Sequence, residues 1–360
     1  MKESVFNKIY KLYSEDLTYS EFEKLFHKDP QGVYQYFIKN IDKKEGSKSS
    51  FKKFLYFSKY LTVAFLKKLS AARRIIFTLS VLMFAYSYFI EDWLYAATSF
   101  GLLIFLILLE VTDKFTAKDE LIIAQNIQES LLPSEVPDIK GYEVSYFYEA
   151  AKEVGGDFID FFHYEDKDNF NITIGDVSGK GLGAALYMFQ TKSLLKQILK
   201  TQNDSLYLLR ELNSTITGSL KKGYFLSIIN ALVKGDEISL SRAGHNPALY
   251  FNSENKIFKE IKPSGIAIGL SKNGLFENSL NTENIKMSKG DILLLYTDGL
   301  NEAMNGKNQQ FGLENIKSVL YHYKDHNADE IKNLIVKNLE HFRGSQLPND
   351  DISFVILKRL

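Results

Sequence analysis

The stretch EVGGDFIDFF, residues 153–162, decides the fold of the second half of this 360-residue chain. Two glycines run into Asp157, and Asp160 follows in a segment whose other side chains are mostly large and apolar. Such a segment is typical of a buried strand, where an unpaired carboxylate costs free energy. The two carboxylates therefore indicate a partner of opposite charge, and a bound metal ion is one candidate.

The composition excludes several classes of protein. Lys+Arg and Asp+Glu are both 44, so the net charge gives no indication of a nucleic-acid partner. The chain has no cysteine, which excludes disulfides, thiolate zinc sites and a cysteine nucleophile. Any metal must then have oxygen or imidazole ligands. The first residues carry charge throughout, so they contain no apolar core of a secretory signal.

Two apolar runs occupy residues 75–90 and 93–109, separated only by Glu91 and Asp92. At 16 and 17 residues, each run is at the short end of what a membrane-spanning helix needs, about 17 to 25 residues. Both are apolar on all sides, whereas a surface helix of a soluble domain has a polar face. The alternative is a pair of buried core helices.

The residues around these runs favour a membrane hairpin. Basic side chains precede the first run and follow the second, and aromatic side chains gather near the acidic turn. This is the positive-inside pattern, and it predicts a two-helix hairpin in the bacterial inner membrane with both termini in the cytoplasm. The basic residues are Lys67, Lys68, Arg73, Arg74, Lys114 and Lys118, and the aromatic ones are Tyr86, Tyr88, Trp93 and Tyr95.

The flanking regions complete a four-part organisation of the chain. Residues 1–74 hold sixteen Lys/Arg and eight Asp/Glu, and their apolar positions suggest short amphipathic helices without a ligand-binding motif. After the hairpin, Ile123, Ile127 and Leu131 share one helical face and Pro133 ends the helix. This helix is either a coiled-coil contact of a homodimer or an ordinary connector. The predicted parts are a basic cytoplasmic region (1–72), the hairpin (73–110), a linker helix (111–134) and a larger domain (135–360).

The larger domain is predicted to be α+β with antiparallel sheets. Its strands mostly cluster along the chain and its helices come in two pairs, which differs from the regular alternation of parallel α/β folds. The predicted strands are 143–150, 158–164, 170–175, 225–234, 237–242, 248–252, 291–297 and 351–358, and the predicted helices are 182–200, 205–220, 312–323 and 328–342.

Four aspartates stand beside glycine or another acid at the ends of these strands. They are Asp157, Asp176, Asp298 and Asp350. Carboxylates that converge without a basic partner repel one another, and a hard divalent cation such as Mg²⁺ or Mn²⁺ removes that penalty. Each aspartate alone could be a turn residue, but four in one domain favour a metal centre.

Eight segments of the chain resemble the SpoIIE/RsbU branch of the metal-dependent protein serine/threonine phosphatases, the type 2C-like fold. They keep the order and spacing of that family between residues 127 and 357. A nucleotide cyclase with a GGDEF motif is excluded, because Phe158 follows Asp157 where an acid is needed. The resemblance implies an α-β-β-α sandwich of two antiparallel sheets with the metals at one end. The segments are IQESLLP (127–133), VGGDFIDFF (154–162), IGDVSGKGLGAAL (174–186), RAGHNPALY (242–250), PSGIAIGL (263–270), LLLYTDGLNEAMN (293–305), FG (311–312) and NDDISFVIL (349–357).

The resemblance also implies a ligand set for two Mn²⁺ or Mg²⁺ ions. Asp176 would bridge both ions, and Asp157 with the backbone carbonyl of Val177 would complete one site. Asp298 and Asp350 would complete the other, with the adjacent Asp351 as a less secure ligand. The reaction implied is one-step hydrolysis of a phosphoserine or phosphothreonine by an activated water.

Three further residues are candidates with open alternatives. Lys180 either steadies a phosphate or is an exposed turn residue. His245, in AGHNP, is either a general acid or a structural histidine that holds its loop. Asp160 lies three residues after Asp157, so in a regular strand the two side chains point to opposite faces and Asp160 is at best a supporting group.

The sequence thus predicts a membrane-anchored phosphatase with its catalytic domain in the cytoplasm. The resemblance implies a substrate that is a phosphorylated regulatory protein of the anti-anti-sigma type, in a partner-switching pathway. One alternative is a membrane scaffold that binds a phosphoprotein without hydrolysing it, although every acidic motif position is filled. Another is a phosphatase that acts on small phosphate esters.

Overall fold

The computed structural model describes residues 62, 65–66, 69–163, 169–271 and 274–360. Most of the predicted basic region lies outside these residues. The chain divides into two compact units, residues 1–115 and 116–360.

The first unit contains a pair of long apolar helices. They are α5 (Ala71–Ile90) and α6 (Trp93–Leu131), and the last part of α6 belongs to the second unit. By length and composition alone, both helices could cross a membrane. The two helices are joined by hydrogen bonds between buried serines: Ser80 Oγ donates to the Ser99 carbonyl at 2.9 Å, and Ser99 Oγ donates to the Ser80 carbonyl at 2.7 Å. At the start of α5, Arg73 forms an ion pair with Glu110 at 2.8 Å.

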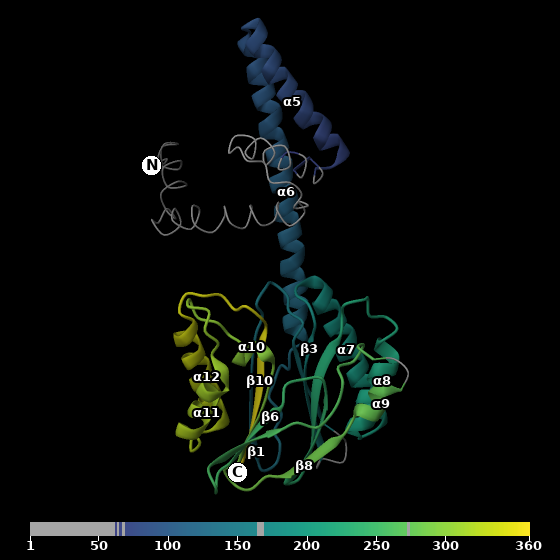
Figure 1. Ribbon diagram of the computed structural model, residues 1–360, viewed down its shortest axis with the longest axis vertical. Helices are drawn as coiled ribbons and strands as arrows, with labels where there is room; N and C mark the ends of the chain where they lie inside the picture. The colour runs from purple at the N-terminus through teal and green to yellow at the C-terminus, as the bar shows by residue number, and fades with distance from the viewer. Residues whose placement is uncertain (1–61, 63–64, 67–68, 164–168, 272–273) are drawn as a thin grey trace, which may run out of the picture. The chain divides into compact units, whose positions relative to one another are not determined.

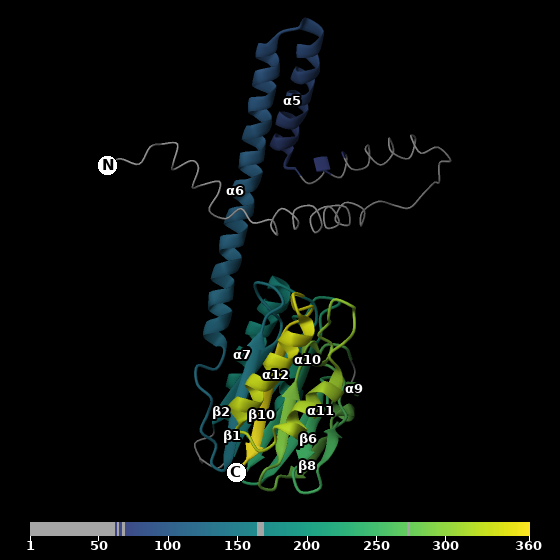
Figure 2. The same ribbon diagram turned by 90° about the vertical axis from the view of Figure 1, so that its left-hand side faces the viewer.

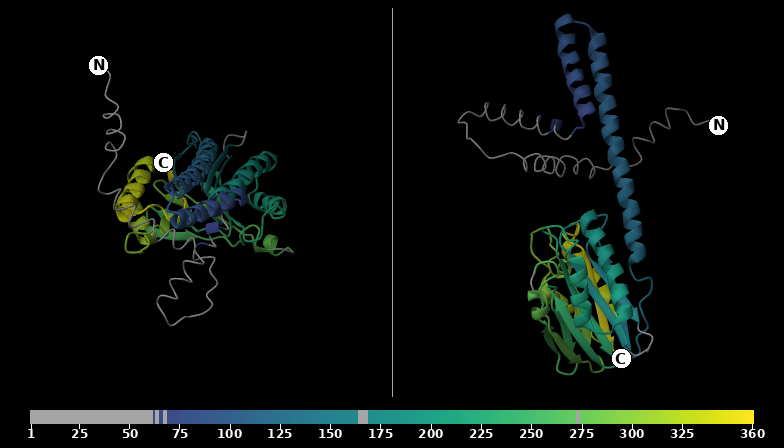
Figure 3. Two further views of the ribbon diagram at one scale, coloured as in Figure 1. Left: turned by 90° about the horizontal axis from the view of Figure 1, so that it is seen from above. Right: turned by 90° about the vertical axis from the view of Figure 1, so that its right-hand side faces the viewer.

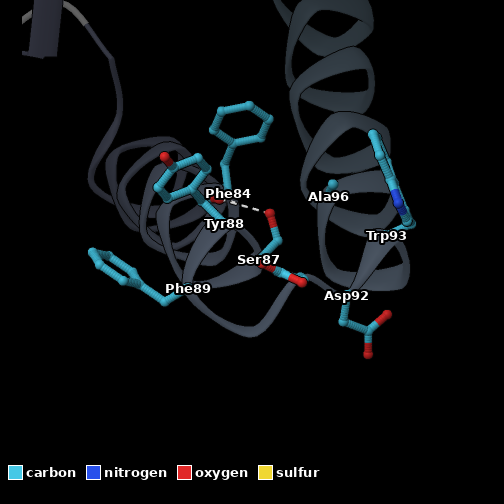
Figure 4. Close-up of a pocket in the computed structure, with 8 residues that line it drawn as sticks. Phe84, Ser87, Tyr88, Phe89, Asp92, Trp93 and Ala96 are labelled. Carbon is cyan, nitrogen blue, oxygen red and sulfur yellow. Dashed lines mark hydrogen bonds between the residues drawn. The ribbon is translucent and has the colours of Figure 1, made fainter.

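The turn between α5 and α6 carries exposed aromatic side chains. Tyr88 and Trp93 are 80% and 87% exposed. Figure 4 shows them at the turn, where Ser87 Oγ donates to the Phe84 carbonyl at 2.7 Å and Asp92 points away from the helices. These two rings therefore lie on the surface of the helix pair and not in a core.

The second unit is built on two five-stranded sheets in which every paired neighbour is antiparallel. One sheet has the order β1-β10-β9-β6-β7 and the other β2-β3-β4-β5-β8. The strands are β1 (Tyr142–Glu149), β2 (Phe158–His163), β3 (Asn169–Val177), β4 (Leu226–Lys234), β5 (Glu237–Ala243), β6 (Ala248–Asn252), β7 (Ile257–Ile261), β8 (Thr282–Lys286), β9 (Ile292–Tyr296) and β10 (Ile352–Arg359).

Helices cover the outer face of each sheet. Figure 1 shows α11 and α12 on one side of the two sheets and α7 and α8 on the other. Figure 2 turns the α11–α12 layer toward the viewer, and the right-hand view of Figure 3 turns the α7–α8 layer forward. The helices are α7 (Leu182–Thr201), α8 (Ser205–Ile216), α9 (Leu275–Ser279), α10 (Asp298–Asn301), α11 (Gly312–His322) and α12 (Ala328–Arg343).

Three apolar clusters hold these four layers together. One lies between the sheets, one between the first sheet and α11–α12, and one between the second sheet and α7–α8. The sequence of strand β9 is apolar throughout because both of its faces are buried. Leu293 packs between the sheets, while Leu294 packs under the helices. A strand buried on both faces has no polar alternation. The predicted α-β-β-α sandwich is confirmed.

The sequence-based elements differ from the structure in two respects. Strands β7 and β8 and the short helices α9 and α10 were not predicted; the two strands lie at sheet edges, and most of their side chains are polar or exposed. The linker helix predicted over 111–134 is not a separate element, because α6 runs unbroken from Trp93 to Leu131.

Candidate metal centre

Asp157 stands at the end of a loop that leads into β2, and its carboxyl group is almost completely buried. Thr297, at the end of β9, donates its hydroxyl to Asp157 Oδ2 at 2.7 Å. The same hydroxyl accepts the backbone N–H of Ser353 at 2.9 Å, which orients it between β9 and β10. A residue 140 positions away therefore fixes the Asp157 carboxylate.

Asp176 and the Val177 carbonyl lie against the same loop from the second sheet. A Cβ built on Gly156 would come within 2.6 Å of the Val177 carbonyl oxygen and 3.2 Å of Asp176 Oδ1. Only glycine allows the loop to approach β3 this closely, because any side chain would fill the space beside these oxygens. The close approach thus gathers a carboxylate and a carbonyl, both hard oxygen donors, next to Asp157.

Asp298 and Asp350 form the more open side of the cluster. Asp298 is the first residue of α10 and is exposed, and Asp350 lies just before β10. Asp350 Oδ2 forms an ion pair with Lys180 at 2.8 Å, and the Lys180 ammonium also donates to the Asn349 carbonyl. Lys180 therefore sits at the cluster, beside one of the predicted ligands.

The electrostatics of the cluster show that its carboxylates are near one another. Burial, then the charges of Asp176 and Asp351, raise the pKa of Asp157 well above its ordinary value. Burial, followed by Asp298 and Asp350, raises the pKa of Asp176 to about 7. Partial burial and then Asp350 raise the pKa of Asp298. A divalent cation would relieve this repulsion.

The residues present fit a hard divalent cation. The donors are carboxylate and carbonyl oxygens, the glycine cradle keeps the space beside them clear, and the carboxylates lack enough cations to balance them. Among the residues that the structure describes, no three acidic or histidine side chains already form a complete cation cage.

Asp351 has a different position from Asp350. Its Oδ1 accepts the N–H of Ala151 at 2.8 Å, and its Oδ2 accepts the N–H of Gly156 at 2.6 Å. Both carboxylate oxygens therefore hold the backbone of the loop that precedes Asp157. This arrangement makes Asp351 a support for the loop, whereas Asp350 pairs with Lys180.

Two of the predicted residues, Asp160 and His245, have partners other than the four aspartates of the cluster. Asp160 is buried, and the charged groups that act on it are Lys192, at 3.9 Å, and Lys196. The Nδ1 of His245 lies 2.8 Å from the hydroxyl of Ser227, and burial lowers the pKa of His245 to about 3. A histidine that is neutral and hydrogen-bonded in this way fits the structural alternative better than a general acid.

Sequence reasoning missed three polar residues that hold the site. Thr297 lies inside the quoted segment LLLYTDGLNEAMN, and Gln128 lies inside IQESLLP, but neither was singled out. Lys192 is buried on α7 and lies outside every quoted segment. Both Thr297 and Gln128 stand inside a segment that resembles the family, but no local feature of the sequence marked either one as a support for Asp157.

Residues 166–360 match the family model described as Stage II sporulation protein E (SpoIIE). The chain is 26% identical over 244 residues to phosphoserine phosphatase RsbU of Bacillus subtilis (strain 168), which covers 67% of this chain and 70% of that protein. It is 29% identical over 272 residues to protein IcfG of Synechocystis sp. (strain ATCC 27184 / PCC 6803 / Kazusa), covering 67% of this chain and 41% of that protein.

Solved structures show the same fold at lower identity. The SiaA-PP2C domain of Pseudomonas aeruginosa has a TM-score of 0.60 and 19% identity, covering 69% of this chain and 98% of that one. The phosphatase domain of SpoIIE from Bacillus subtilis, with a fragment of its regulatory domain, has a TM-score of 0.51 and 19% identity, covering 61% of each chain. These likenesses assign the two-sheet sandwich to the type 2C phosphatase fold.

Proposed function

This chain belongs to the SpoIIE family, and from that premise we propose that it is a membrane-anchored, metal-dependent protein serine/threonine phosphatase. The observation that carries the proposal is the group of Asp157, Asp176, Asp298 and Asp350: Asp176 lies against Gly156, and burial with the neighbouring carboxylates raises the pKa of Asp157, Asp176 and Asp298. The relative named phosphoserine phosphatase supports the reaction class.

The residues of the site would have different roles in the reaction. Asp176, Asp157 and the Val177 carbonyl would hold one divalent cation, and Asp176, Asp298 and Asp350 the other. The cations supply an activated water and offset the charge of the phosphate. The hydroxyl of Thr297 keeps the Asp157 carboxylate in one orientation.

Lys180 would bind the substrate at the more open side of the cluster, which Asp298 and Asp350 form. Its side chain is 41% exposed and paired with Asp350, one of the residues that would hold a cation. From this position its ammonium could contact a phosphate oxygen. Because the chain lacks cysteine, hydrolysis in one step by water suits its composition.

The test is metal-dependent release of phosphate from a phosphoserine peptide by the full chain in detergent. We expect activity with Mn²⁺ that is lost in Asp176→Asn and in Asp298→Asn, while Asp325→Asn keeps wild-type activity. Asp325 is a suitable control because its side chain is 87% exposed and its ion pair, at 3.8 Å, is with the neighbouring Lys324. Binding of Mn²⁺ and of the phosphopeptide without any hydrolysis would instead favour the scaffold. Faster turnover of a small aryl phosphate than of the peptide would favour the small-ester alternative.

The four-part organisation remains part of the proposal: a basic region (1–72), a membrane hairpin (73–110), a linker (111–134) and the phosphatase domain (135–360). The exposed aromatic turn and the apolar surfaces of α5 and α6 support the hairpin. Expressed in bacteria, the chain should stay in the membrane fraction after an alkaline carbonate wash and leave it only with detergent. Release by carbonate alone would contradict membrane insertion.

The proposed substrate is a phosphorylated regulatory protein of the anti-anti-sigma type, by analogy with the RsbU relative. A homodimer through the linker is the second proposed partner. Ile123 and Ile127 on α6 are 59% and 52% exposed, which leaves an apolar face for a second copy. Light scattering of the detergent-solubilised chain should give a dimer that Ile123→Glu/Ile127→Glu converts to a monomer.

A further inference from the structure

The end of α6 is hydrogen-bonded to the loop that carries Asp157. Gln128 is 5% exposed, and its side-chain amide pairs with the backbone of Gly155. Its Nε2 donates to the Gly155 carbonyl at 2.9 Å, and its Oε1 accepts the Gly155 N–H at 2.9 Å. The amide group of the Gln128 side chain thus bonds both the N–H and the C=O of Gly155.

Neighbouring contacts fasten the same helix end to the domain. The buried Lys192 on α7 donates to the Leu131 carbonyl at 2.6 Å and to the Ile159 carbonyl on β2 at 2.8 Å. The Tyr146 hydroxyl on β1 donates to the Pro133 carbonyl at 2.6 Å. Lys192 therefore links the last residue of α6 to β2, and Tyr146 of β1 holds Pro133, two residues after the helix.

Gly155 is held by Gln128 and packs against the carboxylate of Asp351. A Cβ at Gly155 would lie 2.4 Å from Asp351 Oδ2, so the loop is packed directly against that carboxylate. Loss of the Gln128 amide would leave the buried N–H and C=O of Gly155 without partners, two residues before Asp157. The loop would relieve this cost by moving toward water, and Asp157 would move with it.

We propose that Gln128 is a positioning residue for Asp157, so that docking of the α6 end sets the affinity of the site for its divalent cation. This inference rests on the proposed function, because it takes Asp157 as a cation ligand. Groups that support a metal ligand typically change the affinity 10- to 100-fold when removed. Anything that lifts the end of α6 from the loop would weaken cation binding in the same way.

The test compares Gln128→Met with Gln125→Met in the full chain in detergent. Methionine keeps the length of glutamine and removes its hydrogen bonds. Gln125, one turn earlier, reaches only Glu129 on the helix surface, at 3.0 Å. Free Mn²⁺ is measured by electron paramagnetic resonance, and amide hydrogen exchange of residues 151–157 is followed without metal. We expect Gln128→Met to bind Mn²⁺ about 10-fold more weakly and to exchange faster in this loop. Gln125→Met should match the wild type in both.

A second readout separates positioning from a general loss of structure. Phosphate release by Gln128→Met should return to within about twofold of the wild type at saturating Mn²⁺, because the ligands themselves are intact. Equal Mn²⁺ affinity in the two variants would overturn the inference and leave the proposed function standing. So would loss of the folded near-ultraviolet circular dichroism in Gln128→Met, which would make the residue purely structural. A wild-type chain that binds no Mn²⁺ would overturn the proposed function, and this inference with it.

Discussion

The two sides of the carboxylate cluster are built in different ways. On the Asp157 side, the loop is held by Gln128 from α6, by Asp351 from the start of β10 and by Thr297 from β9. On the Asp298 side, the carboxylate is exposed, and Asp350 has an ion pair with a lysine that is itself partly in solvent. The first side is organised by the fold itself, and the second can rearrange around a ligand.

This difference predicts how substitutions divide between stability and catalysis. Changes on the Asp157 side should lower the free energy of unfolding as well as activity, because they disturb buried backbone. Changes on the open side should leave stability nearly untouched. Unfolding is best followed by tyrosine circular dichroism, since the one tryptophan, Trp93, lies outside the phosphatase domain.

Gly156→Ala should have the largest effect. The new methyl group would lie 2.6 Å from the backbone carbonyl of Val177, which belongs to a central strand and cannot withdraw easily. We expect a loss of about 3 kcal/mol in stability and more than about 100-fold in phosphate release. Gly218→Ala is the control, because no atom lies within 4 Å of its added Cβ. Near-wild-type behaviour of Gly156→Ala would mean that the two sides are equally adaptable.

Thr297→Val should come next. It keeps the shape of the side chain but leaves Asp157 Oδ2 and the buried N–H of Ser353 without their partner. We expect a loss of between about 2 and 3 kcal/mol, measured by urea unfolding in the absence of metal. Thr297→Ser retains the hydroxyl and should recover most of this loss. If serine and valine behave alike, the hydroxyl does not hold Asp157.

Lys192 should give the Asp157 side a pH dependence. Burial lowers the pKa of Lys192 from its ordinary 10.5 to about 8. Above pH 8 the unfolded chain keeps a proton that the folded chain has released, so the contribution of Lys192 to stability increases with pH. Between pH 7 and 9.5 the wild type should gain about 2 kcal/mol relative to Lys192→Met. Lys200→Met, at an exposed position about two turns further along the same helix, should show no such divergence.

Lys180→Met should have the smallest effect on stability, below about 0.5 kcal/mol, because its ion pair with Asp350 is partly exposed to solvent. The same variant should release phosphate more slowly from the phosphoserine peptide. A stability loss as large as that of Thr297→Val would contradict the division into a fixed side and an open side. Lys317→Met, which breaks a surface pair with Glu314 far along the chain, is the matched control for stability.

The sequence by itself determined the strand and helix pattern of the phosphatase domain. Apolar runs such as that of β9 and the glycine-bounded aspartates are local features, and their spacing can be seen in a single chain. Edge strands β7 and β8 were not predicted because Ile261 is the one buried residue in the two strands, and polar residues interrupt their apolar pattern. The segments that resemble the family also placed Asp157, Asp176, Asp298 and Asp350 in one site.

Only the tertiary structure decided how those aspartates are held. Asp350 and Asp351 are adjacent in sequence, yet one faces Lys180 and the other bonds the backbone of Ala151 and Gly156. The contacts of Gln128 and Asp351 with the loop span 27 and 195 residues. Local propensity cannot encode pairs so far apart, because they form only when two sheets and α6 pack together and leave each buried polar group with one available partner.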